Sequence, residues 1–431
     1  MVWFKDLRCD SHVGNVSACG GQNNLTLRPC PKRGFHTPAP PWDIWASMKG
    51  GEGFVDWHFG AKVASEAIKP LERTPQMTTI ACFGTGFQRG LAHGETARAE
   101  VRAALARWEE ASLAGLPDVP SIKDYAQRFL AETGLWETAQ HLCPDLADEV
   151  RGIAQGADLP EVVVAAYNLM DEQWWYDFDA SQTPPEAEPG CSLMALTDPN
   201  HIVMAQNMDL PAFMDGSQVI LHLGGPDMPE TLLLSAAGLI GLTGMNRAGV
   251  AICVNTLLML RHQKRGLPVA FMLRRALAER TAESALGVLR ALPHASGQHY
   301  AVADKGGVTG LECSALGAAV SSQGQCRLLH TNHPLASADT DSRALAMLTA
   351  RGRIADSTNR LAHMAALGPQ GTEGVKAMLT DPAAPLCMVA DSASRSQTFG
   401  SVLFELGDSP QGQIRLGLPG RDAWQSLAFT T

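Results

Sequence analysis

Hydrophobic and polar residues follow two different periods along this chain. Between residues 79 and 180, a short strand-like run is followed by segments whose apolar positions recur every three to four residues, as on one face of a helix. These segments predict helices over Glu95–Ala114, Ile122–Leu135, Leu146–Ala154 and Leu159–Trp175. We therefore expect this part of the chain to be mainly helical.

After residue 190 the pattern changes to short runs rich in Val, Ile and Leu, separated by turn residues. They predict strands over Ser192–Thr197, His201–Asn207, Val219–Leu223, Thr231–Ser235, Val250–Asn255, His299–Ala303 and Gly400–Leu406, with helices around Val269–Arg280 and Ala282–Leu292. Between two of the strands, Asp304-Lys305-Gly306-Gly307 is typical of a hairpin turn. Hairpins mixed with pairs of helices predict an α+β fold in which helices sandwich two antiparallel sheets, an αββα arrangement.

The composition is that of a globular protein, with 431 residues of which 45% are hydrophobic and 18% charged. A formal net charge of −10 and the lack of a Lys/Arg run argue against a nucleic-acid partner. No apolar stretch is long enough to span a bilayer, so no membrane partner is expected. The first residues, Met1 to Asp6, lack the basic region and apolar core of a secretory signal, and we expect a cytoplasmic protein.

The cysteines indicate neither a redox motif nor a ribbon-type zinc site, because the ten of them are scattered without a Cys-x-x-Cys pair. Cys253 and Cys313 alternate with Val, Ile and Leu and are interpreted as buried small hydrophobes. The only other grouping has spacings that match no familiar metal site, and consists of Cys9, His12, Cys19, Cys30 and His36. We therefore expect no metal and no cofactor.

The dipeptide Gly190-Cys191 constrains the chemistry most. It follows the segment Thr183 to Pro189, whose prolines and glutamates predict an exposed loop, and it precedes the first predicted hairpin, so the cysteine opens a strand. If the Cys191 thiolate attacks the Gly190 carbonyl, the peptide bond becomes a thioester that water can open. The new α-amino group of Cys191, with an ordinary pKa of roughly 7.7 to 8.0, can then act as the general base for its own thiol. A loop followed by a buried cysteine is the alternative.

Several short motifs, in the same order along the chain, resemble the acyl-coenzyme A:6-aminopenicillanic acid acyltransferase family. They begin with the Gly-rich run from Phe83 to Gly94 and include Gly190-Cys191-Ser192-Leu193, Ala205-Gln206-Asn207-Met208-Asp209, the run from Gly244 to Ala251, and His330-Thr331-Asn332-His333-Pro334. This family of isopenicillin N acyltransferase-like, peptidase C45-type enzymes consists of self-processing N-terminal-nucleophile hydrolases related to the choloylglycine hydrolases. The resemblance implies a four-layer αββα sandwich of that type.

Carried over by position, the resemblance makes Cys191 the nucleophile and Asp209 the residue that orients it. Asn332 corresponds to an oxyanion-hole residue, and Asn255 to a second asparagine near the oxyanion in the choloylglycine branch. Ser394 and Arg395 correspond to a Ser-Arg pair that lines the acyltransferase site. Taken in isolation, Asp209 and Asn332 would be read as turn residues, and the spacing alone does not place the Asp209 carboxylate beside the thiol.

Two positions depart from the family pattern, because Leu193 and Val269 stand where the acyltransferase has Thr and Ser. Leu193 is retained as a substrate-binding position. The loss of two hydroxyl groups weakens the case for a penicillin substrate and coenzyme A, and leaves the nucleophile unaffected.

We therefore expect a self-processing cysteine amidohydrolase that cleaves a linear amide through a thioester. An acyltransferase that moves an acyl group to an amine is the first alternative, and a catalytically dead binding protein on the same fold is the second. The expected parts are an extension over residues 1–75, a small chain over 76–190 and a large chain over 191–431. The partner is a small-molecule amide, and the two processed chains are expected to form a heterodimer, with further oligomerisation left open.

Overall fold

The structure is a computed structural model. It describes residues 78–114, 116, 118–181, 190–198, 201–381, 385–390, 396–421 and 423–429. The predicted extension, the loop from Thr183 to Pro189, and the predicted substrate residues Ser394 and Arg395 lie outside the described residues.

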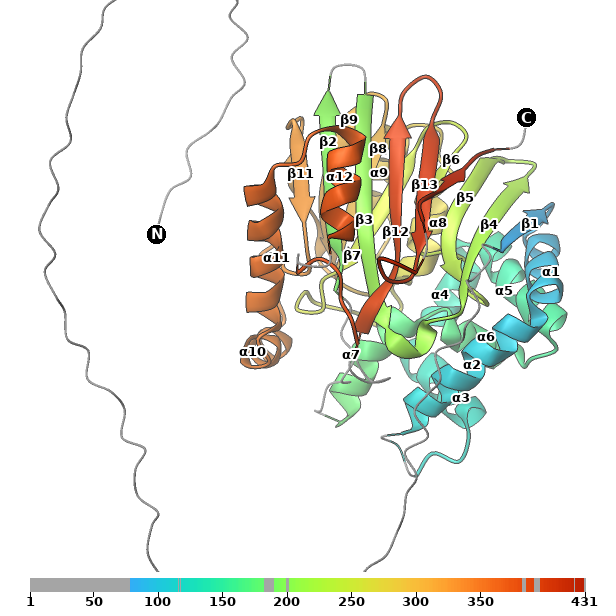
Figure 1. Cartoon of the computed structure of the whole chain (residues 1–431). Helices are drawn as coiled ribbons and strands as arrows, with labels where there is room; N and C mark the ends of the chain where they lie inside the picture. The colour runs from blue at the N-terminus through green and yellow to red at the C-terminus, as the bar shows by residue number, and fades with distance from the viewer. Residues whose placement is uncertain are drawn as a thin grey trace, which may run out of the picture. The chain divides into compact units, whose positions relative to one another are not determined.

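The described residues before 182, from Thr78 on, are helical apart from one strand, as the sequence predicts (Figure 1). Its elements are β1 (Thr79–Phe83), α1 (Gly86–Thr96), α2 (Arg98–Leu113), α3 (Ile122–Thr133), α4 (Leu135–Leu142), α5 (Pro144–Ala157), α6 (Glu161–Tyr167) and α7 (Met170–Ser181). The prediction of one helix over 159–175 is wrong, because α6 ends where the Asn168 side chain bonds to the Val164 and Gly238 carbonyls. Helices α1 and α4 were not predicted.

Helices α1 and α5 pack backbone to backbone along a seam of glycines. Gly90 of α1 lies so close to α5 that a Cβ placed on it would be 1.8 Å from the Glu149 carbonyl oxygen. A Cβ on Gly152 of α5 would lie 2.3 Å from the Phe87 carbonyl oxygen. Only residues without a side chain permit this approach, so the Gly-rich run from Gly86 on forms a helix contact.

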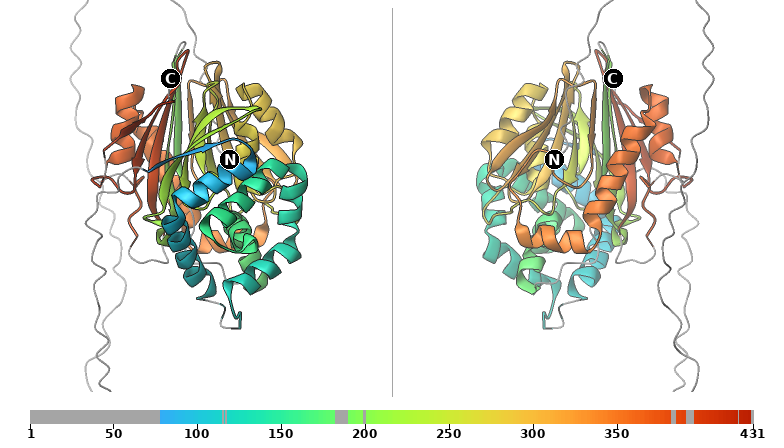
Figure 2. Two further views of the ribbon diagram at one scale, coloured as in Figure 1. Left: turned by 90° about the vertical axis from the view of Figure 1, so that its right-hand side faces the viewer. Right: turned by 90° about the vertical axis from the view of Figure 1, so that its left-hand side faces the viewer.

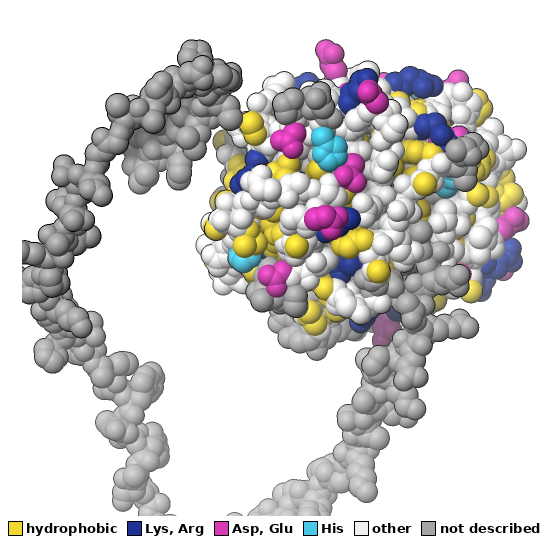
Figure 3. Space-filling model, turned by 45° about the horizontal axis from the view of Figure 1, so that its top comes forward, with side chains coloured by type: hydrophobic (Ala, Val, Ile, Leu, Met, Phe, Trp, Pro, Cys, Tyr) yellow, Lys and Arg dark blue, Asp and Glu magenta, His cyan; other side chains and the backbone are white. Residues whose placement is uncertain are grey.

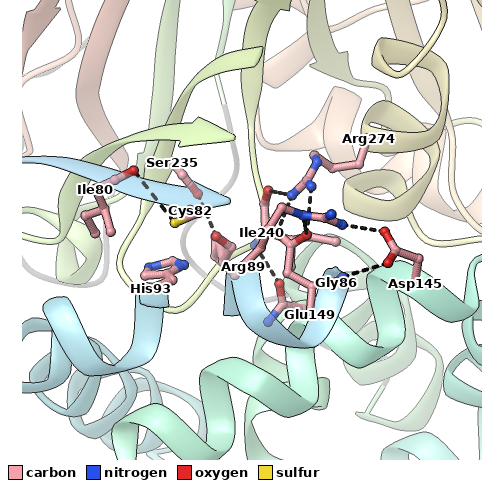
Figure 4. A network of polar contacts seen from close by, with 12 residues as sticks. Ile80, Cys82, Gly86, Arg89, His93, Asp145, Glu149, Ser235, Ile240 and Arg274 are labelled. Atoms are coloured by element: carbon pink, nitrogen blue, oxygen red, sulfur yellow. Dashed lines mark hydrogen bonds and ion pairs between the residues drawn. The ribbon is translucent and has the colours of Figure 1, made fainter. Parts of the chain in front are cut away.

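A buried network of ions lies beside this seam (Figure 4). The Arg89 Nε donates to Glu149 Oε2 at 2.8 Å, and Arg274 Nη1 donates to Glu149 Oε1 at 2.6 Å. Arg89 also contacts Asp145. Burial by itself raises the pKa of the Glu149 carboxyl, but Arg274 and Arg89 more than offset this and hold the pKa below its ordinary value. The carboxylate is therefore charged. It links Arg89, which precedes Cys191 in the sequence, to Arg274, which follows it.

The described strands form two sheets, one with eight strands and one with six. The first has the order β1-β4-β5-β6-β7-β8-β9-β10, with β4 (Gln218–Gly225), β5 (Met228–Ala236), β6 (Thr243–Asn246), β7 (Ala251–Thr256), β8 (Gln298–Asp304), β9 (Gly307–Ser314) and β10 (Gly317–Gln323). The second has the order β11-β2-β3-β12-β13-β14, with β2 (Ser192–Asp198), β3 (His201–Pro211), β11 (Arg327–His330), β12 (Ser396–Leu406), β13 (Gln411–Leu416) and β14 (Gln425–Leu427).

The pairing confirms the predicted hairpin at Asp304, which pairs with Gly307 across the turn between β8 and β9. It corrects one expectation, since β1 pairs with β4 in parallel and the larger sheet is therefore mixed. A parallel neighbour is possible here because seven α-helices and β2–β3 lie between the two strands in sequence, which leaves room for a crossover.

Helices flank the two sheets, which face each other (Figure 2). Helices α8 (Val269–Leu277) and α9 (Ala282–Ala291) lie beside the eight-stranded sheet, and α11 (Arg353–Leu367) and α12 (Gly371–Thr380) beside the six-stranded one, with α10 (Ser342–Ala350) preceding them. The buried side chains form a main hydrophobic core and a smaller one, and alternate residues of β2 point into different cores. Leu193 packs in the main core, and Met194 packs in the smaller core with Met364 and Val375. The protein is thus an α+β fold with two sheets, as predicted.

On the face seen in Figure 3, acidic and basic side chains are interspersed and not separated by sign. None of the helices that the structure describes combines the length and apolar character needed to cross a bilayer.

The glycine seam predicts a sharp contrast between two Gly→Ala substitutions in helices. Gly90→Ala should lower the free energy of unfolding by about 1 to 3 kcal/mol or more, because its methyl group must push α1 and α5 apart. Gly287→Ala in α9, where a Cβ would meet nothing within 4 Å, should raise it by up to about 1 kcal/mol through helix propensity. Urea denaturation of both variants checks this, and equal effects would contradict the close packing.

Candidate active site

Cys191 lies buried at the entrance to β2, with only 3% of its surface exposed. The β2–β3 ladder pairs Ser192 with Asn207, and the Gly190 N–H continues it by donating to the Asp209 carbonyl at 3.2 Å. The register of this hairpin therefore brings Asp209 opposite Gly190. The spacing in the sequence left this proximity open.

The Asp209 carboxylate is fully buried, and only one of its two oxygens has a hydrogen-bond partner. Its Oδ1 accepts a hydrogen bond from Thr398 Oγ1 at 2.7 Å, while its Oδ2 has no partner. The free oxygen faces Gly190, because a Cβ placed on that glycine would lie 3.4 Å from it. Burial raises the pKa of the Asp209 carboxyl to about 7, against the lowering effects of Thr398 and Arg360. This carboxyl can thus exchange a proton near neutral pH.

The Cys191 thiol is a poor nucleophile in this structure. Burial and then the charge of Asp209 raise its pKa to about 12, and the Asp209 backbone and Arg360 only partly oppose them. Since the thiolate is the reactive form, the thiol must transfer its proton to a base.

Asn332 contacts the backbone of Cys191 directly. Its Oδ1 accepts a hydrogen bond from the Cys191 N–H at 2.7 Å, and its Nδ2 donates to the Thr256 carbonyl at 3.1 Å. The Asn332 N–H donates to Ser357 Oγ at 2.8 Å, which also lies 2.8 Å from His333 Nδ1. His333 is thus held by a neighbouring hydroxyl, while the carboxamide of Asn332 is fixed against the predicted nucleophile.

Arg360 of α11 is a site residue that the sequence analysis missed. It is buried, and its guanidinium donates to the Cys191 carbonyl at 2.7 Å, to Ser192 Oγ at 3.1 Å and to Asn332 Oδ1 at 2.9 Å. Its spacing along the helix could have indicated a buried position, because Arg360 lies three residues after Ser357 and four before Met364. All three are buried and lie on the inner face of α11.

The second predicted oxyanion residue, Asn255 of β7, is fully buried and has no hydrogen-bond partner for either carboxamide atom. It pairs in register with His299, whose ring stacks on His330 of the other sheet at 3.6 Å. Its side chain therefore points between the sheets, on the side of the six-stranded sheet. The structure does not bring it into hydrogen-bond contact with Cys191.

Leu193 is fully buried in the main core, and its predicted part in substrate binding stays a prediction. A small cleft adjoins the partners of Cys191 and includes Thr256, Asn332, Asp356 and Arg360 in its walls. Within the ranges that the structure describes, no group of three or more His, Cys, Asp or Glu side chains is arranged to hold a metal ion.

Comparison with known proteins agrees with the resemblance seen in the motifs. Residues 196–420 match the model of the acyl-coenzyme A:6-aminopenicillanic acid acyl-transferase family. A relative from Emericella nidulans, described as the acyl-coenzyme A:6-aminopenicillanic-acid-acyltransferase 40 kDa form, is 26% identical over 352 residues, 80% of this chain and 93% of its own. The penicillin V acylase of Agrobacterium tumefaciens is 15% identical, with a TM-score of 0.32 over 52% of this chain and 82% of its own, a likeness too weak to argue from.

The buried Asp209 carboxyl predicts a specific dependence of stability on pH. Its pKa is about 7 in the folded protein against an ordinary 3.8, so between these values the folded state holds a proton that the unfolded chain has released. Its contribution to stability therefore falls as the pH rises from about 4 to about 7 and is constant above. Asp209→Asn removes this contribution, and the variant should gain stability over its parent across that window.

The measurement is urea denaturation of parent and variant at several pH values, both in a Cys191→Ala background that removes the nucleophile which self-cleavage would need. Asp158→Asn, at a carboxylate whose side chain is 84% exposed, controls for the loss of a surface charge. A difference between parent and Asp209→Asn that does not change with pH would show that Asp209 is charged throughout.

Proposed function

Because this chain belongs to the acyl-coenzyme A:6-aminopenicillanic acid acyltransferase family, we propose that it is an enzyme that acts on a linear amide bond with Cys191 as its nucleophile. The observation that carries this proposal is the surroundings of Cys191. A buried carboxylate with an unpaired oxygen, an asparagine carboxamide and a buried arginine all converge on one cysteine at the start of a strand.

The first step that we propose is self-cleavage before Cys191. The thiolate attacks the Gly190 carbonyl, the carbon–nitrogen bond breaks, and the Cys191 nitrogen leaves as an amine that takes up a proton. The free Oδ2 of Asp209, on a carboxyl whose pKa is about 7, is suited to accept the thiol proton before that amine exists. Water then opens the thioester, which gives a small chain ending at Gly190 and a large chain beginning at Cys191.

In the mature enzyme the same cysteine attacks the substrate amide. The Cys191 amine is the general base, and Asp209 holds it in place. Asn332 and Asn255 bind the oxyanion, a role in which the loss of one donor typically costs about 2.7 to 4 kcal/mol of barrier. The unpartnered carboxamide of Asn255 supports this assignment, because a buried N–H group without an acceptor is what a developing negative charge requires.

Arg360 positions these groups without attacking the substrate. It donates to the Cys191 carbonyl and to the oxygen of the Asn332 carboxamide. Both contacts fix the nucleophile relative to the oxyanion donors, and the positive charge opposes the rise in the pKa of the thiol and of Asp209.

The fold that fits this chemistry is the four-layer αββα sandwich of the N-terminal-nucleophile hydrolases, which the two flanked sheets support. After cleavage the small and large chains would form a heterodimer. The ion pairs between Glu149 and Arg274 would hold the two together, since they join residues on either side of the cut.

We favour hydrolysis over acyl transfer, because Leu193 and Val269 offer no hydroxyl to hold a polar amine acceptor. Acyl transfer is the second candidate, favoured by the name of the relative from Emericella nidulans. A catalytically dead binding protein is the third, and the presence of both Cys191 and Asp209 argues against it.

Self-cleavage predicts that the purified protein consists of two associated fragments, the larger beginning at Cys191. Cys191→Ala should give a single uncut and inactive chain, because no attacking group remains. Intact-mass measurement and N-terminal sequencing check this. Cys326→Ala, at an exposed cysteine, is the matched control and should be cut as the parent is. An uncut parent chain that nevertheless hydrolyses amides would rule out the proposed mechanism.

The second prediction concerns the fate of the acyl group. The enzyme is given N-acyl amides with and without amine acceptors, or acyl-coenzyme A. It should release mainly free acid, because no hydroxyl group at Leu193 or Val269 holds an amine in place to compete with water for the thioester. Free acid and new amide are quantified by mass spectrometry. Efficient amide formation from acyl-coenzyme A, with little acid, would make the protein an acyltransferase while leaving Cys191 as the nucleophile.

A further inference from the structure

Two adjacent carboxylates, Asp171 and Glu172, lie in the first turn of α7 and are not used by the mechanism above. Glu172 is fully buried. Its Oε1 accepts hydrogen bonds from the Val269 N–H at 3.0 Å and from Ser296 Oγ at 2.7 Å. Its Oε2 is buried without any partner. Buried polar atoms are nearly always satisfied, so this oxygen requires an explanation.

Asp171 is half-buried beside it. Its Oδ2 accepts from Thr256 Oγ1 and from Gln298 Nε2, both at 3.0 Å. The Oε1 of Gln298 is also buried and unpartnered. The cluster formed by Asp171, Glu172 and Gln298 therefore contains more acceptors than the surrounding donors can satisfy.

The cluster also lacks a positive charge. Among the residues that the structure describes, no Lys, Arg or His forms an ion pair with Asp171 or Glu172. Burial, and then the charge of Asp171, raises the pKa of the Glu172 carboxyl to about 8, and burial raises the pKa of Asp171 as well. Ionising both buried carboxyl groups without a cation is costly, and a cation bound between them would relieve this cost.

The cluster lies next to the predicted nucleophile. Thr256 donates its hydroxyl to Asp171 and accepts the Asn332 amide at its carbonyl, and Asn332 in turn contacts Cys191. Thr256 and Asn332 both line the small cleft described above. Asp171 is therefore separated from the wall of this cleft by one side chain, that of Thr256.

We propose that Asp171 and Glu172 form a subsite for an ammonium group carried by the amide substrate. This rests on the proposed function, because it assumes that an amide is processed at Cys191. An ammonium group brings three N–H donors and a positive charge, which are what the cluster lacks. A metal ion suits the cluster less well, since the two carboxylates have no third His, Cys, Asp or Glu arranged with them among the described residues.

The first test uses pairs of amides that differ only in a terminal ammonium or a methyl group, placed on the acyl side or on the amine side. The parent enzyme should prefer one ammonium-bearing amide by at least tenfold in kcat/KM. The double variant Asp171→Asn, Glu172→Gln should lose at least tenfold of that preference. The matched control is Asp177→Asn on the same helix, whose carboxylate accepts from Tyr125, and it should keep the preference.

Equal kcat/KM for both members of every pair in the parent, or an equal loss for both in the double variant, would overturn the proposal. The absence of any amide turnover would instead contradict the proposed function, and a binding measurement separates the two cases. In the Cys191→Ala chain, n-pentylammonium chloride should raise the melting temperature, and Glu172→Gln in the same background should abolish the shift. No shift, or an equal shift with potassium chloride, would exclude an ammonium subsite.

Discussion

The buried carboxylate of Glu149 is the constraint on which the arrangement of this protein depends. A charged group at 2% exposure is stable only with partners, and Arg89 and Arg274 supply them from α1 and α8. Arg89 reaches Glu149 because the neighbouring Gly90 lets the two helix backbones touch. Arg274 ties the same point to α8, whose first N–H, at Val269, binds Glu172. A single buried ion thus connects α1 and α5 to α8 and, through α8, to the cluster beside Cys191.

The candidate site is assembled by pairing between distant parts of the chain. Asp209 comes from the strand that returns after the first turn, Asn332 from the segment after β11, and Arg360 from a helix 169 residues beyond Cys191. The position of Asp209 depends on the register of the six-stranded sheet, since a shift of one residue would turn it to the other face. The rigidity of the site is therefore that of a central sheet and not that of a loop.

The sequence predicted the elements that carry strong periodicity. Strands such as Ser192–Thr197 and helices such as Ile122–Leu135 lie within a few residues of their observed bounds. Helix α1 escaped prediction because Gly86 and Gly90 are weak helix formers in isolation, and only the contact with α5 justifies them. Arg360 was not predicted, because a buried arginine can be assigned to a site only from the residues that it contacts. Its contacts, Cys191 and Asn332, are far away in sequence. Asp209 was identified through the family resemblance, while its free oxygen is visible only in three dimensions.

Cleavage before Cys191 would change the charges at this site as well as the covalent structure. In the uncut chain the thiol, whose pKa is about 12, faces a carboxyl whose unpaired oxygen has no donor. The new α-ammonium group would give that oxygen a donor and a positive charge, which lowers the pKa of Asp209 and of the thiol together. The same event would therefore supply the amine that acts as general base, once it has lost its proton, and would make the cysteine a better nucleophile. On the proposed mechanism, a deeply buried cysteine would thus become reactive only after cleavage.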